Sequence, residues 1–121
     1  MTFPLVVQAF DAERSFGSLR VADIVVAAET LLSAVDVKAI ATPPGLGSPA
    51  GRHHHDFDQL FYVIDGEMSL EIGDWQGTAG AGSVVVFPAG IEHRNWNAGT
   101  ETVKHLAFNI PTVEGGQHDR R

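Results

Sequence analysis

The sequence contains no cysteine and few basic residues, and both absences exclude classes of function. Without cysteine the chain forms no disulfide and offers no thiolate, so a bound metal must be held by nitrogen and oxygen atoms. Eight lysines and arginines stand against 15 acidic residues, which gives a net charge of −7. Because binding to a phosphate backbone needs clustered basic side chains, we expect no nucleic-acid partner.

Long apolar segments are also missing. The apolar runs are far shorter than the roughly 20 residues of a membrane-spanning helix, so we expect no membrane partner. The first residues, Met1–Pro4, lack the basic and apolar regions of a signal peptide, which favours a cytoplasmic location. With 121 residues, the chain fits one domain over residues 1–121. Residues 1–17 would form an N-terminal arm or strand, and the polar residues 114–121 a loose tail.

Short strands separated by turn signals dominate the pattern. Apolar and β-branched residues predict strands over Leu5–Phe10, Ser18–Val26, Val35–Ala41, Gln59–Ile64, Met68–Ile72, Ser83–Phe87, His93–Trp96 and Val103–Ile110. Glu29–Ser33 predicts a turn, although near-helical spacing leaves a helix over Asp23–Val35 as an alternative to the second strand. Asp65-Gly66 predicts a β-hairpin between its flanking strands. Many short strands with turns between them are typical of a sandwich or barrel.

Some of the predicted strands are apolar on both faces. In Gln59–Ile64 both alternating sets contain apolar residues, and Val84–Phe87 has no polar position at all. Because one face of a small antiparallel sheet normally meets water, the second apolar face needs a cover. Either the N-terminal segment or a second copy of the chain could supply it. The N-terminal segment is short, so we favour a homodimer.

Three histidines and a glutamine are spaced so that they could surround one point. His53 and His55 point the same way on an extended strand, about 7 Å apart. Gln59 is an even number of residues further along the chain and would point to the same face. His93 follows a Pro-Ala-Gly turn that would begin a neighbouring strand. Residues of opposite parity next to these positions are not expected in the site, namely Arg52, His54 and Arg94.

Two blocks of spaced residues contain these candidates. The first block is Gly47, His53, His55, Gln59 and Gly66, and the second is Gly82, Pro88, Gly90, His93 and Asn97. They resemble the two motifs of the cupin superfamily, and the 15 residues between the blocks match small single-domain microbial cupins. The resemblance implies an all-β fold, the cupin double-stranded β-helix or jelly-roll barrel. The glycines and Asn97 fall in turns, where we expect a structural role.

The resemblance also implies a metal site. Its ligands fall on His53, His55, Gln59 and His93, with glutamine in place of the usual glutamate. The ion would be one divalent metal, and nitrogen and oxygen ligands suit Fe, Mn, Ni, Zn, Co or Cu.

The glutamine changes the charge of this site. A glutamate would cancel one positive charge of the ion, and Gln59 cancels none. We therefore expect weaker metal binding, a more acidic metal-bound water and readier binding of anionic chelating substrates. The alternative is a site that has lost its function, but three intact histidines favour a functional variant.

Further residues are candidates for the surroundings of the metal. Phe57, Phe61 and Val63 share the face of the ligands and would line an apolar pocket or belong to the core. Asn95 has the parity of His93 and could donate a hydrogen bond to a substrate. His105 is a weaker candidate, because Leu106, Phe108 and Ile110 on the opposite face of its strand look like the core.

The functional expectation is metal-dependent chemistry on a small, anionic or chelating organic molecule. Three neutral histidines and open coordination positions favour a dioxygenase. A Lewis-acid cyclase or isomerase of the zinc type, similar to polyketide cyclases, is the alternative enzyme. The non-enzymatic alternative is a cupin that binds or senses a small molecule.

Overall fold

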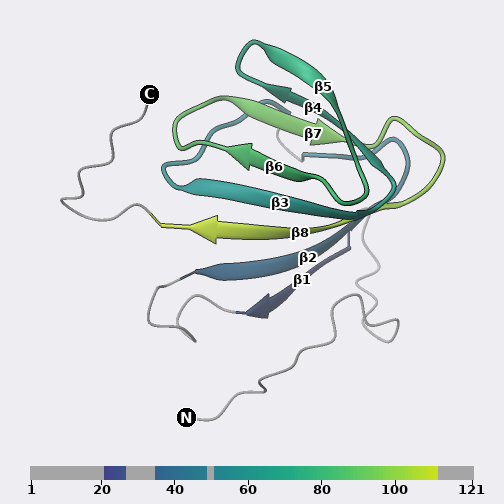
Figure 1. Cartoon of the computed structure of the whole chain (residues 1–121), viewed down its shortest axis with the longest axis horizontal. Coiled ribbons are helices and arrows are strands. Elements are labelled where there is room, and N and C mark those ends of the chain that lie inside the picture. The colour runs from purple at the N-terminus through teal and green to yellow at the C-terminus, as the bar shows by residue number, and fades with distance from the viewer. Residues whose placement is uncertain (1–20, 27–34, 49–50, 112–121) are drawn as a thin grey trace, which may run out of the picture.

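The chain folds into two antiparallel β-sheets that enclose a common interior (Figure 1). The computed structural model describes residues 21–26, 35–48 and 51–111. The larger sheet has five strands in the order β1 (Val21–Val26), β2 (Asp36–Thr42), β8 (Val103–Ile110), β3 (Asp58–Asp65) and β6 (Val84–Phe87). The smaller sheet has the order β5 (Trp75–Gly80), β4 (Glu67–Ile72) and β7 (His93–Trp96). The predicted all-β fold is confirmed.

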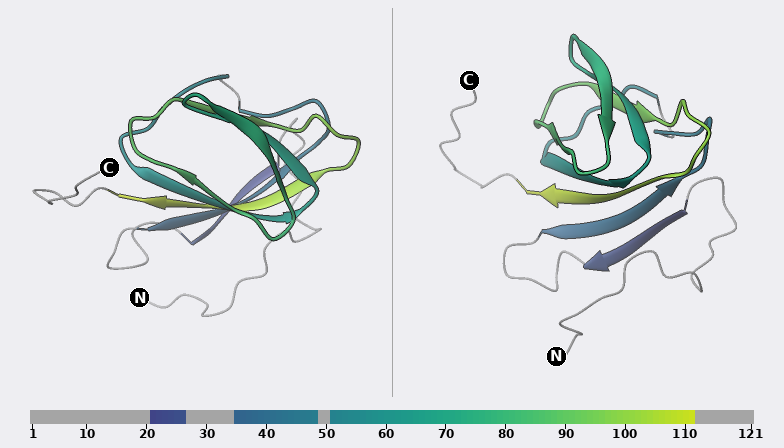
Figure 2. Two further views of the ribbon diagram at one scale, coloured as in Figure 1. Left: turned by 45° about the horizontal axis from the view of Figure 1, so that its top comes forward. Right: turned by 45° about the vertical axis from the view of Figure 1, so that its right-hand side comes forward.

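The two sheets are offset from one another. The views in Figure 2 show the smaller sheet beside β6 and β3, with β1 and β2 at the far edge of the larger sheet. No helix in the described segments is long and apolar enough to cross a membrane.

Most of the predicted strands are present. The strand predicted to end at Val26 is confirmed over residues 21–26, which contradicts a helix beginning at Asp23. The other predicted strands from Val35 onward match β2, β3, β4, β6, β7 and β8 within a few residues. The strand Leu5–Phe10, the arm over residues 1–17, the turn at Glu29–Ser33 and the tail over residues 114–121 lie outside the described residues.

The strand Trp75–Gly80 has no counterpart among the predictions. It pairs with β4 from Ile72 to Glu67, after a turn at Gly73 with a φ of +56°. Glycines within this segment lower its intrinsic tendency to form a strand. Gly77 also lies under the ring of Trp75, where an added Cβ would be 2.6 Å from a ring carbon. Pairing with β4 therefore decides this element, and local propensity does not.

The turn at Asp65-Gly66 is not a β-hairpin, so that prediction is wrong. β3 pairs with β6 and β8, whereas β4 pairs with β5 and β7, so the turn carries the chain from one sheet to the other. Gly66 has a φ of +85°, and an added Cβ would meet the backbone of Val103 at 3.0 Å. An Asp-Gly pair permits a sharp turn, but the pairing of the strands around it depends on the rest of the barrel.

The core lies between the inner faces of the two sheets. Its buried members include Phe61, Val63, Met68, Leu70, Phe87, Val103 and Ala107. On β8 the buried positions are Val103, His105 and Ala107, whereas Leu106, Phe108 and Ile110 are only partly buried. The expectation that the latter set forms the core face is therefore wrong. Both faces of β8 are largely apolar, so alternation alone could not identify the inner one.

The outer face of β3 and β6 is apolar and exposed. Tyr62, Ile64, Val84 and Val86 are 40–62% exposed, and Tyr62 lies opposite Val84 in the ladder. A second copy of the chain could cover this surface, and the homodimer stays a prediction.

Candidate metal centre

His53, His55 and His93 converge at one end of the barrel interior. His53 and His93 form an isolated antiparallel bridge in which each backbone N–H donates to the other carbonyl, at 2.9 and 2.8 Å. One ligand atom from each of the three rings lies within 4.8 Å of the others. Three imidazole nitrogens at this separation can bind a single ion after small movements of the side chains.

The turn before β7 positions these histidines. β6 ends before Pro88, and Gly90 adopts a φ of +83° that favours glycine. The backbone N–H of Gly90 donates to the carbonyl of His55 at 2.8 Å. The Pro-Ala-Gly turn therefore starts the strand of His93 and also holds the backbone of His55.

Backbone carbonyls decide which ring nitrogens face the centre. Nδ1 of His53 lies 2.9 Å from the carbonyl oxygen of Gly51, and Nδ1 of His93 lies 3.0 Å from that of Ile91. Because a carbonyl only accepts hydrogen bonds, Nδ1 carries the proton in both rings and Nε2 keeps its lone pair. Nε2 of His93 is fully buried and has no hydrogen-bond partner in the described part of the chain. A metal ion would satisfy this nitrogen, so the residues fit the ion.

The environment also keeps two of these rings neutral. Burial lowers the pKa of His93 below its ordinary value, and the neighbouring histidines lower it further. The hydrogen bond to the Ile91 carbonyl acts in the opposite direction and offsets part of the decrease. Burial is likewise the main cause that lowers the pKa of His55, and His53 and His54 add to it. Metal ions bind the neutral imidazole, so both shifts favour metal binding near neutral pH.

Gln59 lies on the inner face of β3, between Phe87 on β6 and Asn109 on β8. The ring of Phe87 packs against His93, with 4.4 Å between the ring centroids. Nε2 of Gln59 donates to Oδ1 of Asn109 at 2.7 Å. Because this hydrogen bond engages the amide nitrogen, the side-chain carbonyl oxygen of Gln59 is the atom that could bind a metal. The role of Gln59 as a ligand stays a prediction.

The aromatic candidates occupy two levels of the barrel. Phe57 stacks on His55, with centroids 4.6 Å apart and an interplanar angle of 11°. Phe61 and Val63 are 4% and 0% exposed and belong to the core. His105 is fully buried and packs against Phe61 at 4.2 Å between centroids. Only Phe57 of this group makes a ring contact with a candidate ligand.

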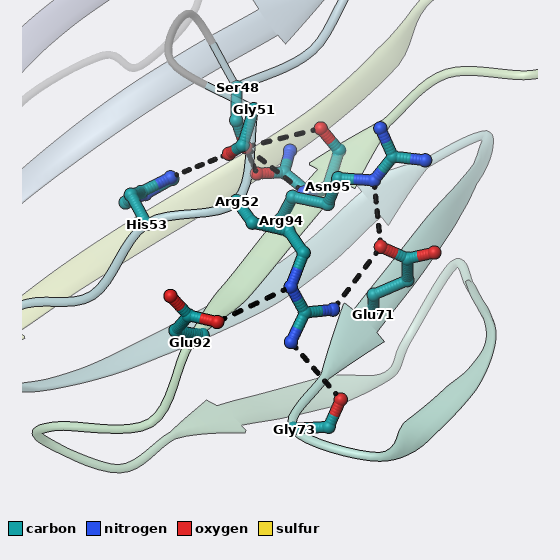
Figure 3. A network of polar contacts seen from close by, with 9 residues as sticks. All are labelled: Ser48, Gly51, Arg52, His53, Glu71, Gly73, Glu92, Arg94 and Asn95. Carbon is teal, nitrogen blue, oxygen red and sulfur yellow. Dashed lines mark hydrogen bonds and ion pairs between the residues drawn. The ribbon is translucent and has the colours of Figure 1, made fainter.

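Asn95 shares the inner face with His93, but its side chain holds a loop. The hydroxyl of Ser48 donates to Oδ1 of Asn95 at 2.9 Å, and the backbone N–H of Asn95 donates to that hydroxyl at 3.0 Å (Figure 3). The backbone N–H of Ser48 donates to the Asn95 carbonyl at 2.8 Å. Asn95 therefore anchors the chain before the histidine segment.

The arginines beside the ligands lie outside the site and share one carboxylate, as Figure 3 shows. Oε1 of Glu71 lies 2.9 Å from Nε of Arg94 and 3.3 Å from Nη1 of Arg52. Since Arg52 precedes His53 and Arg94 follows His93, Glu71 connects both ligand-bearing segments to β4. His54 is exposed. The parity argument that removed these three residues from the site is consistent with this geometry.

Two charged residues of β2 on the inner face were missed by the sequence analysis. Asp36 and Lys38 lie opposite Asn109 and Ala107, whose strand positions face inward. The charge of Lys38 contributes to lowering the pKa of His55, so its ammonium lies within electrostatic reach of the site. Asp36 and Lys38 stand at every second position before Ile40 along β2 and therefore share its face, which was the pattern that could have identified them. The sequence does not show, however, which face of β2 points inward.

Comparisons with known proteins place this geometry in a family. No curated protein matches the chain. A solved rmlc-like cupin with a double-stranded β-helix fold from Methanocaldococcus jannaschii is 18% identical, with a TM-score of 0.69 and coverage of 92% of this chain and 94% of that one. A predicted oxalate decarboxylase from Thermotoga maritima is 21% identical, with a TM-score of 0.70 and coverage of 77% and 81%.

A third solved structure is a putative sugar phosphate isomerase from Acidithiobacillus ferrooxidans. It is 28% identical, with a TM-score of 0.57 and coverage of 64% of this chain and 51% of that one. The family model described as the cupin domain matches residues 40–109, which contain all four candidate ligands. The chain therefore belongs to the cupin family, and its barrel is the double-stranded β-helix of that family.

Proposed function

We propose that this cupin binds one divalent metal ion through His53, His55 and His93, with the carbonyl oxygen of Gln59 as a fourth ligand. The observation that carries the proposal is the orphaned Nε2 of His93, buried beside two further imidazoles. A buried nitrogen without a partner costs roughly 1–3 kcal/mol, and a metal ion would remove that cost. The carbonyls of Gly51 and Ile91 support the same ligand geometry.

The metal centre acts on a small, anionic, oxygen-chelating molecule. The neutral Gln59 leaves the positive charge of the ion uncompensated by its ligands, which favours an anion. Lys38 adds a cation within reach of His55, where the carboxylate of Asp56 acts in the opposite sense and more strongly. Among proteins with this fold, one is named as a predicted oxalate decarboxylase and another as a putative sugar phosphate isomerase, names that refer to small oxygen-rich anions.

The residues of the chain would prepare the substrate in distinct ways. The bound ion would polarise the oxygen atoms of a chelated anion, and redox metals would also allow chemistry with dioxygen. Lys38 would attract the anion, while Phe57 and Phe87 present apolar ring faces beside the histidines that limit the access of water. We expect dioxygenase activity, with Lewis-acid cyclisation or isomerisation as the alternative.

Metal analysis of the natively purified protein tests the site. We expect close to one divalent ion per chain in the wild type and a loss of the ion in His93→Ala. His54→Ala is the matched control, because His54 is exposed and lies outside the triad. If His93→Ala kept its metal, the assignment of the ligands would be wrong. If the wild type neither carried nor accepted a metal, the protein would be a binding module.

Oxygen uptake then tests the reaction. The metal-loaded protein is offered diketones, catechols, flavonols and 2-hydroxy-enones in an oxygen electrode, and the products are followed in parallel. Uptake that depends on His93 is the result expected for a dioxygenase. Conversion of a substrate without uptake would contradict the dioxygenase and favour the Lewis-acid enzyme.

A further inference from the structure

A small cavity adjoins the metal site on the side of β2. It has a volume of about 160 Å³ and is lined by Asp36, Phe57, Asn109 and Pro111. Two of its walls connect directly to candidate ligands, because Phe57 stacks on His55 and Asn109 accepts a hydrogen bond from Gln59. The cavity therefore lies next to the residues that hold the candidate ligands, although none of these ligands lines it, and it has room for a group about the size of a benzene ring.

Asp36 brings a carboxylate to this cavity without using it in the fold. Oδ1 of Asp36 is buried and has no hydrogen-bond partner among the described residues. The backbone of β2 is held by its ladders with β1 and β8, which do not need this side chain. A buried carboxylate oxygen without a donor is costly, so its presence beside a cavity indicates that a ligand supplies the donor.

Asn109 offers the complementary group. Its Oδ1 accepts the hydrogen bond from Gln59, and in the part of the chain that the structure describes its Nδ2 makes no hydrogen bond. The cavity thus presents one strong acceptor, Asp36 Oδ1, and one amide donor, Asn109 Nδ2. A hydroxyl group satisfies both, because it donates one hydrogen bond and accepts another. An ammonium group could only donate, and a carboxylate could only accept.

We propose that this cavity is a subsite for a hydroxyl group of the substrate, which donates to Asp36 and accepts from Asn109. The inference rests on the proposed function, since the same molecule would chelate the metal through anionic oxygen atoms. The substrate class is then a small hydroxylated acid. Asn109 also holds the amide of Gln59, so a hydroxyl bound in the cavity would contact the residue that orients a metal ligand.

Two acids of equal chain length test the subsite. Gluconate and 2-hydroxyhexanoate share the chelating 2-hydroxycarboxylate, but only gluconate carries further hydroxyl groups. In calorimetric titrations of the metal-loaded protein, we expect the wild type to prefer gluconate by roughly tenfold, the worth of one hydrogen bond to a charged group. Asp36→Asn should lose most of this preference, while its metal content and its affinity for 2-hydroxyhexanoate stay unchanged.

The control for charge is Asp56→Asn. Asp56 is exposed, lies next to His55 in sequence and does not line the cavity, so this variant should keep the preference for gluconate. Circular dichroism checks that each variant is folded, and Asp36→Ser replaces Asp36→Asn if the latter does not fold. Loss of the preference in both Asp36→Asn and Asp56→Asn would overturn the subsite.

Failure of the subsite and failure of the metal centre give different results. If the wild type holds its metal and binds both acids equally, the cavity contains only water and the hydroxyl subsite is wrong. If the wild type holds no metal, the proposed function fails, and the substrate assignment falls with it.

Discussion

The two ends of the barrel interior share strands β3 and β8 but differ in the chemistry of the groups buried there. At the apolar end, formed by Val63, Met68 and Val103, the side chains are 0–1% exposed. Among the buried polar groups there, Asn97 makes three hydrogen bonds, whereas the hydroxyl of Thr42, which lies opposite Val103, has no partner among the described residues. At the metal-site end, the groups without a partner among the described residues belong to ionisable side chains, namely Nε2 of His93 and Oδ1 of Asp36.

This difference separates stability from function within one barrel. Tightly packed apolar side chains stabilise the fold, whereas buried ionisable groups without a partner cost free energy until a ligand supplies one. Along β3, only four residues separate Val63 at the apolar end from Gln59 at the metal-site end. We expect substitutions at the apolar end to change the free energy of unfolding and substitutions at the metal-site end to change ligand binding.

The largest effect on stability is expected at the apolar end. Met68→Ala removes a fully buried side chain from the core and should lower the free energy of unfolding by about 3 kcal/mol. Metal content should not change, because Met68 belongs to the core rather than to the histidine cluster. Urea unfolding and metal analysis of the same sample measure both quantities. A loss of metal at full folding would show that the two ends are coupled.

Asn97→Ala should cost about 2 kcal/mol in the free energy of unfolding. Nδ2 of Asn97 donates to the carbonyls of Thr42 and Glu101, at 2.9 and 2.7 Å, and Oδ1 accepts from Gly99 at 2.9 Å. Without these bonds, the carbonyls of Thr42 and Glu101 and the backbone N–H of Gly99 lose this partner. Thermal unfolding checks the prediction, with Asn97→Asp as a partial replacement that keeps the acceptor. A neutral outcome for Asn97→Ala would contradict its structural role.

Gln59→Glu tests the charge at the metal-site end. Metal affinity should rise by roughly tenfold or more, because a full negative charge attracts a divalent ion more strongly than an amide dipole does. Binding of anionic ligands and turnover should fall, because the added negative charge repels an anionic ligand. Competition with a chelator measures the first effect, and Gln76→Glu on the exposed surface of β5 is the control. Tighter metal with unchanged turnover would refute a functional role of the neutral ligand.

The pH dependence of stability should come from the metal-site end of the metal-free protein. Burial lowers the pKa of His55 and His93 in the folded state, so the unfolded chain takes up protons first as the pH falls. Stability is therefore full above pH 6.5, the ordinary histidine pKa, and decreases as the pH falls below it. Unfolding at a series of pH values measures this decrease, and a flat profile between pH 7 and 5 would contradict it.

The smallest effect is expected for Glu71→Gln. The ion pairs of Glu71 with Arg52 and Arg94 are partly exposed, so solvent screens them and their loss should cost less than about 1 kcal/mol. Because Glu71 connects the segments of His53 and His93, a modest decrease in metal affinity should accompany the change. Glu101→Gln, at an exposed position, is the matched control. An unchanged affinity would show that β-sheet pairing alone positions the ligands.

The candidate site could be predicted in outline because each of its residues stands in a recognisable local pattern. The alternation expected of a strand placed His53 and His55 on one side, although in the structure only His53 of the two forms a β-bridge, and the Pro-Ala-Gly turn precedes the strand of His93. The contribution of β2 could not be predicted in this way. Asp36 and Lys38 enter the interior only through the ladder with β8, some 70 residues away in sequence.

The sequence by itself determined the all-β class, most strand positions, the family and the three histidines of the candidate centre, because these depend on composition, alternation and fixed spacings. Only the tertiary structure decided that Asp65-Gly66 joins two sheets, that Trp75–Gly80 is a strand, and that His105 faces inward while Leu106 faces outward. The physical reason is that pairing partners and inner faces depend on closure of the whole barrel, and strands that are apolar on both sides carry no local signal for either.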